Sequence, residues 1–209
     1  MQQHLKALLP TDYWPKIFLG LYNGGWLAQL SSDIPASTDG QNSELLSHVK
    51  RIVGRLRELG TPIETIRPTH PYQVSIRFRD GVPAGHMWFV IADALKQAGL
   101  KEITVVHSKH SVDVLETGVD KSHLVARMVQ EFRIDPYQIL TLGDQGAWPG
   151  NDASLLEHRY SLSVDVPSRR IDRGWKAAPI HKRDVDATLW YLERVKLIGG
   201  GAFQINLST

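Results

Sequence analysis

The stretch QILTLGDQGAWPGNDASLL, residues 138–156, decides how this sequence folds and where its chemistry lies. Residues 139–142 form an apolar run of strand-like composition that places Asp144 at its carboxyl end. A loop rich in glycine and proline then presents Asn151 and Asp152 at the start of a predicted helix, residues 153–158. The sequence therefore predicts that two carboxylates and an amide converge at one strand end.

In an open α/β sheet, the crevice at the carboxyl ends of the strands is where ligands bind. Hard oxygen ligands suit Mg²⁺, which keeps waters and takes phosphate oxygens of the substrate as further partners. Lys121 opens the predicted helix that precedes the Asp144 strand, and a fixed ammonium beside acidic ligands neutralises a phosphoryl group. We therefore expect this crevice to hold Mg²⁺ and a small phosphorylated substrate.

Composition excludes several other classes of site. The 209 residues have a formal net charge of +2, and lysine and arginine are dispersed, which argues against a nucleic-acid partner. The chain contains no cysteine, so a disulfide framework, a thiolate zinc site and a cysteine nucleophile are all excluded. The N-terminus lacks a leader-like pattern, and no apolar run approaches the roughly 20 residues that span a bilayer. We expect a soluble, cytoplasmic protein with no membrane partner.

The N-terminal part and the central part of the chain have different patterns. Residues 17–22 and 26–30 read as two strands joined at Asn23-Gly24-Gly25, a turn that tolerates positive φ, and residues 31–42 have the composition of an exposed connector. Residues 42–116 then read α, β, β, α, β, β. The first helix is predicted over residues 45–59, with Asn42 or Ser43 as its N-cap and Gly60 as its stop. This central block predicts a small α+β domain with both helices on one side of the sheet.

From Ser122 onward, helix and strand alternate, as in a mostly parallel sheet covered by helices. Strands are expected over residues 139–142 and 160–164, a helix over 184–197 and a last strand over 202–207. The sequence thus predicts an α/β protein in which residues 1–41 and 117–209 form a partial core. The α+β domain of residues 42–116 is inserted into that core.

The order of these motifs resembles the haloacid dehalogenase (HAD) superfamily of phosphatases. Residues 117–121, TGVDK, are similar to its third motif, and Leu142-Gly143-Asp144 with Gly150-Asn151-Asp152 is similar to its fourth. Asn23-Gly24-Gly25 looks like the turn that sugar-phosphatase-like members carry before an inserted cap. Residues 42–116 look like the type 2 cap itself. The resemblance covers nearly the whole chain and implies a partial Rossmann-like core.

The resemblance also implies residue roles. Asp144 and Asp152 would hold Mg²⁺, Asp144 and Lys121 would serve catalysis, and Asn151 would be a supporting polar group. Asn23 and Gly24 would contact the substrate, as would Arg77 on the polar face of the cap. The implied activity is hydrolysis of a phosphate monoester, for example of a sugar phosphate.

The sequence departs from the family pattern twice. Residues 147–150, AWPG, lengthen the fourth motif, so Asp152 is expected to approach from a bulged loop. The first motif, an apolar strand ending in Asp-x-Asp-Gly-Thr, is absent, and so is the second motif. The nucleophilic aspartate is therefore missing, and we expect little or no phosphatase activity from this chain. A homo-oligomer or a complementary N-terminal segment would supply the missing half. Alternatively, the chain is a non-catalytic module that binds phosphate or protein.

Simpler interpretations remain open for each residue. The acids near residue 150 could cap a helix, Lys121 could be a solvated helix residue, and Asn23-Gly24-Gly25 could be a plain hairpin turn. The face that carries Arg77 could be merely solvated. A pair of histidines, His107 and His110, lacks a third ligand and is a weak metal candidate.

Overall fold

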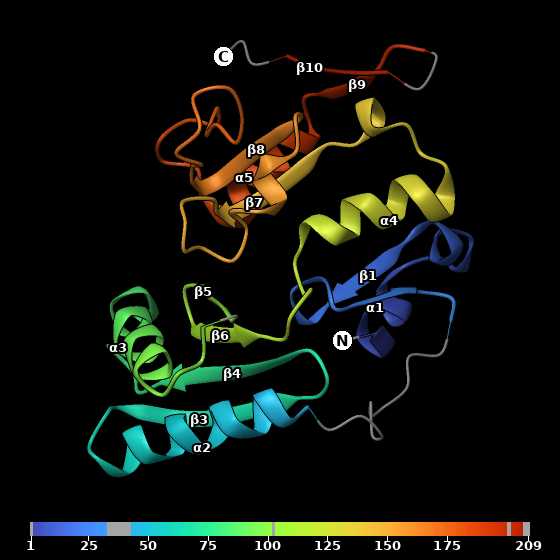
Figure 1. Ribbon diagram of the computed structural model, residues 1–209. Helices are drawn as coiled ribbons and strands as arrows, with labels where there is room; N and C mark the ends of the chain where they lie inside the picture. Colours follow the sequence, from blue (N-terminus) through green and yellow to red (C-terminus); the bar gives the residue numbers. More distant parts are fainter. Residues whose placement is uncertain (1, 33–42, 102, 200–201, 207–209) are drawn as a thin grey trace. The chain divides into compact units, whose positions relative to one another are not determined.

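The computed structural model describes residues 2–32, 43–101, 103–199 and 202–206 (Figure 1). Contacts between residues divide the chain into two compact units. The first unit contains Met1–Val105 and His110–Asp120, and the second contains Val106–Lys109 and Lys121–Thr209. Most of the predicted connector, residues 33–42 with the alternative helix cap Asn42, lies outside the described residues.

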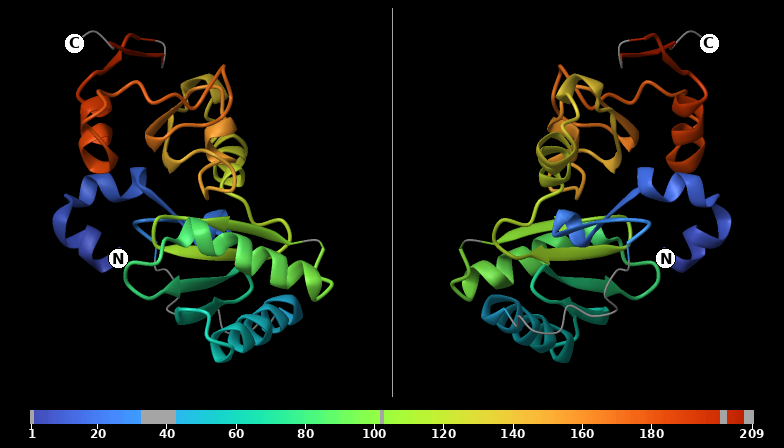
Figure 2. Two further views of the ribbon diagram at one scale, coloured as in Figure 1. Left: turned by 90° about the vertical axis from the view of Figure 1, so that its left-hand side faces the viewer. Right: turned by 90° about the vertical axis from the view of Figure 1, so that its right-hand side faces the viewer.

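The first unit has a short hairpin followed by a four-stranded antiparallel sheet with two long helices (Figures 1 and 2). Sheet order is β3-β4-β6-β5, and β1 pairs with β2 in a separate antiparallel ribbon. Residues Val106–Lys109, which include part of the turn between β5 and β6, belong to the second unit. The elements are α1 (Gln2–Leu8), β1 (Phe18–Leu21), β2 (Trp26–Gln29), α2 (Glu44–Glu58), β3 (Ile63–Thr69), β4 (Gln73–Phe78), α3 (Ala84–Gln97), β5 (Thr104–His107) and β6 (Ser111–Leu115), with 3-10 turns at Thr11–Lys16 and Tyr22–Gly24.

Helix α2 forms where its hydrophobic spacing predicts. Its buried residues are Leu46, Val49 and Val53, and the Ser43 hydroxyl caps the helix by accepting a hydrogen bond from the Leu46 N–H at 3.0 Å. Both helices bury side chains in one apolar core with alternate residues of the sheet, such as Val74 and Ile76 on β4. The predicted order α, β, β, α, β, β is confirmed.

The second unit is built on two parallel strands. Thr141 lies opposite Ser161 in the pair β7–β8, and within the described residues β7 has no other strand beside it. Helix α5 buries Ala187, Trp190 and Tyr191 against β8. The elements are α4 (Ser122–Phe132), β7 (Thr141–Gln145), β8 (Ser161–Val166), α5 (Asp184–Leu192), β9 (Val195–Leu197) and β10 (Phe203–Ile205), with 3-10 turns at Pro136–Gln138 and Leu155–Glu157.

The helix predicted over residues 153–158 is wrong. The chain there makes turns and one 3-10 turn, Leu155–Glu157, and His158 is already extended. The physical reason lies in Asp152, whose side chain accepts hydrogen bonds from the strand β7 instead of capping a helix. A single helix-like bond, from the Leu156 N–H to the Asp152 carbonyl at 2.9 Å, brings Leu156 into the core and the helix goes no further.

The C-terminal helix is shorter than predicted. Helix α5 ends at Leu192, whereas the prediction ran to residue 197, because residues 195–197 pair antiparallel with β10. The final strand is Phe203–Ile205, and residue 207, where the prediction ended it, lies outside the described residues. No helix in the described part of the chain is long and apolar enough to cross a membrane.

Candidate functional site

The predicted site residues of the second unit lie at the end of β7. Asp144 is the last residue but one of the strand, and the side chain of Asp152 packs directly over Gly143. A Cβ atom at residue 143 would lie 2.7 Å from the Cβ of Asp152, which is closer than real contacts. Glycine at this position therefore leaves the space that Asp152 occupies.

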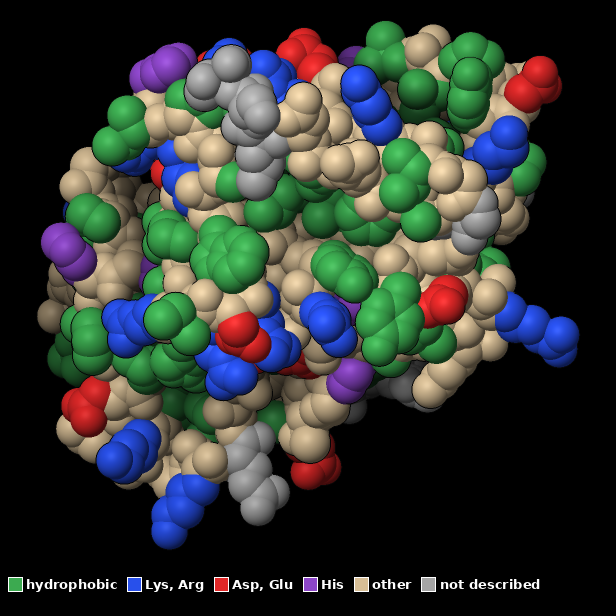
Figure 3. Space-filling model, turned by 90° about the horizontal axis from the view of Figure 1, so that it is seen from above, with side chains coloured by type: hydrophobic (Ala, Val, Ile, Leu, Met, Phe, Trp, Pro, Cys, Tyr) green, Lys and Arg blue, Asp and Glu red, His purple; other side chains and the backbone are tan. Residues whose placement is uncertain are grey.

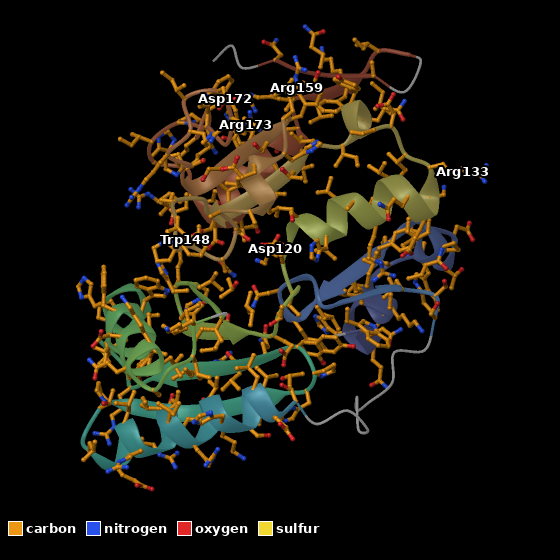
Figure 4. All side chains as sticks on the ribbon, viewed as in Figure 1. Asp120, Arg133, Trp148, Arg159, Asp172 and Arg173 are labelled. Carbon is orange, nitrogen blue, oxygen red and sulfur yellow. The ribbon has the colours of Figure 1, made fainter. Side chains whose placement is uncertain are left out.

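The lengthened loop returns Asp152 to the strand. Gly150 lies so close to the strand that a Cβ there would stand 2.3 Å from the carbonyl oxygen of Gln145. Trp148, which is labelled in Figure 4, is one of the inserted residues, and its side chain is 53% exposed. The Oδ2 atom of Asp152 accepts hydrogen bonds from the backbone N–H of Asp144 at 2.7 Å and of Gln145 at 3.2 Å. The insertion thus forms a bulge, as expected, and Asp152 still reaches Asp144.

Lys121 completes this group. It stands at the N-terminal end of α4, and its Nζ atom lies 2.6 Å from Oδ1 of Asp152. The Asp152 side chain is only 7% exposed, so this ion pair is largely shielded from water. Asp144, Asp152 and Lys121, which are far apart in sequence, therefore form one cluster in the structure.

The two carboxyl groups have different acidities. Burial and the neighbouring Asp152 raise the pKa of Asp144 from 3.8 to about 6. Burial alone would also raise the pKa of Asp152, but the Lys121 ammonium and hydrogen bonds that include the Asp144 N–H hold it below its ordinary value. Asp152, with its lowered pKa, is thus the anion of the pair, and Asp144, with its raised pKa, is the carboxyl group that is protonated more readily.

The oxygen atoms present fit a magnesium ion. Asn151 adds a buried amide oxygen, Oδ1, for which the described structure shows no hydrogen-bond partner. Among the described residues no cluster of three or more acidic, histidine or cysteine groups could hold a metal. Mg²⁺ does not need such a cage, because it binds through one or two carboxylates, waters and substrate phosphate. Asp144 and Asp152, with Asn151 nearby in sequence, match that chemistry.

Sequence reasoning missed a second group of charges beside Asp144. Lys109 forms ion pairs with Asp165, at 2.7 Å, and with Asp184, and its Nζ atom lies 4.0 Å from Oδ2 of Asp144. Asp165 is near the carboxyl end of β8, so the strand-end argument that selected Asp144 could have found it. Nothing in the sequence indicated that Lys109 would reach these acids.

Comparison with known proteins identifies the family. The sequence model for sucrose-6F-phosphate phosphohydrolase matches residues 46–179, which is more than half of the chain. The chain belongs to this family. Its sucrose-phosphatase-like members have the HAD fold, so the predicted superfamily and the α/β fold class are confirmed. The segment that matches the sucrose-6F-phosphate phosphohydrolase family contains Arg77, Lys121, Asp144, Asn151 and Asp152.

Solved structures of sugar phosphatases are similar to this family member over part of their length. Trehalose-6-phosphate phosphatase of Aspergillus fumigatus is 18% identical with a TM-score of 0.46, and the match covers 79% of this chain and 66% of that one. Sucrose-phosphatase of Synechocystis sp. PCC6803 is 18% identical with a TM-score of 0.43, covering 71% and 58%. The chain thus spans less than two thirds of either structure. No individual curated protein matches it.

The remaining predicted residues of this family member lie in the first unit. Asn23 has a φ of 52°, and its Nδ2 donates hydrogen bonds to Oε1 of Gln73 at 2.7 Å and to Oδ2 of Asp113 at 3.4 Å. Gly24 follows with a φ of 93° and is buried. Arg77 is exposed on β4. Asn23 thus joins the β1–β2 turn to the sheet, and a substrate contact by these three residues remains a prediction.

Proposed function

We propose that this chain provides the metal-binding part of a Mg²⁺-dependent phosphatase that hydrolyses the phosphate monoester of a small sugar phosphate. The observation that carries the proposal is the cluster of Lys121, Asp152 and Asp144 at the end of β7. Membership of the sucrose-6F-phosphate phosphohydrolase family supports the substrate class. Asn151, in the same unit as the cluster, would contact the substrate.

Each member of the cluster has a distinct role in this proposal. Asp144 and Asp152 would hold Mg²⁺, which supplies positive charge to the phosphoryl oxygens. Asp152 is fixed in orientation by two backbone N–H groups and by Lys121, so its carboxylate is preorganised. The Lys121 ammonium stands beside the acids and would stabilise negative charge that develops on the phosphoryl group.

This sequence lacks the nucleophilic aspartate that the family's covalent route requires. We therefore propose that the isolated chain is inactive and that a complementary strand, on an N-terminal segment or a second copy, docks beside β7. Within the described residues, β7 has a strand on one side only. Unpaired strand edges readily accept a strand from another chain.

The surface of the second unit supports a missing partner. Helix α5 buries one face, yet Val185, Leu189 and Leu192, spaced as one stripe, are each more than half exposed. Helix α4 is amphipathic, yet none of its described residues is fully buried. Figure 3 draws one face of the molecule, on which hydrophobic side chains lie among charged and polar ones. Exposed apolar surface of this kind is typical of an interaction site.

The test combines binding and turnover. Calorimetry should show that the isolated chain binds Mg²⁺ and that Asp144→Asn binds it at least tenfold more weakly. Hydrolysis of p-nitrophenyl phosphate with Mg²⁺ should be at background for the chain alone. Adding a peptide with an apolar strand ending in Asp-x-Asp-Gly-Thr should produce turnover that Asp144→Asn lacks. Turnover by the chain alone that depends on Asp144 would overturn the proposed inactivity.

The second candidate is a non-catalytic module that binds phosphate or a protein. The exposed apolar side chains of α5 favour it, because they would suit a contact with another protein. The same experiment separates the two functions, because a pure binding module would bind Mg²⁺ or inorganic phosphate and stay inactive with the added peptide.

A further inference from the structure

Lys109 is a second lysine near the candidate metal site, and the proposed chemistry uses only the first, Lys121. Lys121 already neutralises Asp152, whereas Lys109 lies near the other acid of the pair, Asp144. Its ammonium contacts Asp165 and Asp184 directly and lies 4.0 Å from Oδ2 of Asp144. Three carboxylates from three separate elements therefore surround one ammonium.

The backbone holds Lys109 in this place. The N–H of His107 donates to the carbonyl of Pro149 at 2.9 Å, and the N–H of Asn151 donates to the carbonyl of His107 at 2.9 Å. His107 and Gly150 form an isolated parallel bridge. The segment 106–109 is thus bonded to the loop that carries Asn151 and Asp152, and the position of Lys109 is tied to that of the site.

The charges of this network are nearly balanced. Its ion pairs connect the carboxylates of Asp144, Asp165 and Asp184 to Lys109, with Arg183 placed 3.4 Å from Asp165. Together with the Lys121–Asp152 pair, four acids face three cations, which leaves one excess negative charge when all are ionised. Asp165 is 8% exposed, so its charge is compensated mainly by Lys109 and Arg183 and little by water.

A divalent ion at Asp144 would meet the ammonium of Lys109 at close range. Two cations a few ångströms apart repel each other, and both attract the same carboxylate. We propose that Lys109 is an internal competitor that weakens the binding of a divalent metal ion at Asp144 and so sets its affinity. This inference rests on the proposed magnesium site. Lys109 acts in this scheme through its charge, both by repelling the ion and by competing for the carboxylate of Asp144.

Removing the charge of Lys109 should raise the Mg²⁺ affinity, whereas damage to the site would lower it. Replacing Lys109 by Met removes one positive charge and should tighten Mg²⁺ binding by about tenfold at low ionic strength. Lys109→Gln, which keeps a hydrogen-bond donor for Asp165, should tighten it similarly and serves if the Met variant fails to fold. Lys109→Arg keeps the charge and should bind like the unmodified chain. A distorted site would bind the ion more weakly, not more tightly.

Lys196→Met is the matched control. Lys196 is an exposed lysine of the same unit on β9, so its replacement makes the same chemical change away from the network. Its Mg²⁺ affinity should equal that of the unmodified chain. The gain from Lys109→Met should also shrink as KCl is raised, because salt screens the repulsion.

Isothermal titration calorimetry with MgCl₂, with circular dichroism to confirm folding, measures all five proteins. Tighter binding by Lys109→Met or Lys109→Gln, or binding that appears only in these variants, supports the inference. Equal or weaker binding by both folded variants, with Mg²⁺ still bound by the unmodified chain, overturns the role of Lys109 alone. If no protein binds Mg²⁺, the magnesium site itself is wrong and the role of Lys109 is overturned with it.

Discussion

The carboxylate of Asp152 bonds to Lys121 through Oδ1, at 2.6 Å, while its other oxygen receives two backbone N–H groups of strand β7. The side chain is therefore both a candidate metal ligand and a structural link between α4, the lengthened loop and the strand. A change at Asp152 should therefore affect both the stability of the fold and the candidate metal site.

Asp152→Ala should destabilise the protein strongly. The change leaves the N–H groups of Asp144 and Gln145 and the ammonium of Lys121 without their partner at a buried position. We expect a loss of about 3–5 kcal/mol in the free energy of unfolding. Urea unfolding followed by circular dichroism measures it. A loss below about 1 kcal/mol, the typical worth of an exposed ion pair, would contradict the buried linkage.

Gly143→Ala should disturb the site through contact alone. The new Cβ would lie 2.7 Å from the Cβ of Asp152 and must displace it, with a cost of about 1–3 kcal/mol. Mg²⁺ affinity should fall in parallel. Gly54→Ala is the control, because a Cβ there meets nothing within 4 Å and alanine is the better helix former. That variant should gain about 0.5–1 kcal/mol of stability. Equal effects of the two changes would contradict the close packing at residue 143.

The pH dependence of stability should change in Asp144→Asn. The pKa of Asp144 is raised from 3.8 to about 6, so the folded state binds its proton more tightly than the unfolded state does. The stabilisation from this group is complete below pH 3.8 and is lost as pH rises through about 6. Without metal, Asp144→Asn should therefore gain stability relative to the unmodified chain between these values.

Water screens the charge of Asp144, so the stability gained in Asp144→Asn should be small. The Asp144 side chain is 35% exposed, so we expect a difference on the order of 1 kcal/mol at pH 7.5. Urea unfolding in EDTA at pH 4, 6 and 7.5 measures it. A difference that is constant across this range would show that Asp144 has an ordinary pKa.

Tyr191→Phe should weaken the core of the second unit. The buried hydroxyl donates to the carbonyl of Ser163 at 2.9 Å and accepts from the N–H groups of Ala177, at 2.8 Å, and Ala178, at 2.9 Å. Losing it leaves buried polar groups unpaired, and we expect a cost of about 1–3 kcal/mol. Tyr137→Phe, at a tyrosine that is 59% exposed, should be near neutral. Similar Tm values for both variants would argue against this network.

Sequence periodicity was sufficient to predict those helices and strands whose structure depends mainly on their own residues. The hydrophobic spacing and Ser43 cap of α2, the alternation on β4 and the apolar run before Asp144 each led to the observed element within a few residues. The motif order also associated Lys121 with Asp144 and Asp152, and the structure brings these three side chains together.

Contacts between distant segments defeated the local patterns. Residues 153–158 have helix-like spacing, yet Asp152 bonds to β7 and the helix does not form. Residues 195–197 continue the pattern of α5, yet they pair with β10. In each case hydrogen bonds to another part of the chain outweigh a weak local helical preference.

The sequence by itself determined the family, the α/β class and the acids and lysine at the end of β7, because these depend on residue type and order along the chain. Only the tertiary structure decided that Asp152 is the anion of the pair, that Asp144 is protonated more readily, and that Lys109 lies among three carboxylates. Burial and the distances between charges set these properties, and both depend on which distant segments come together.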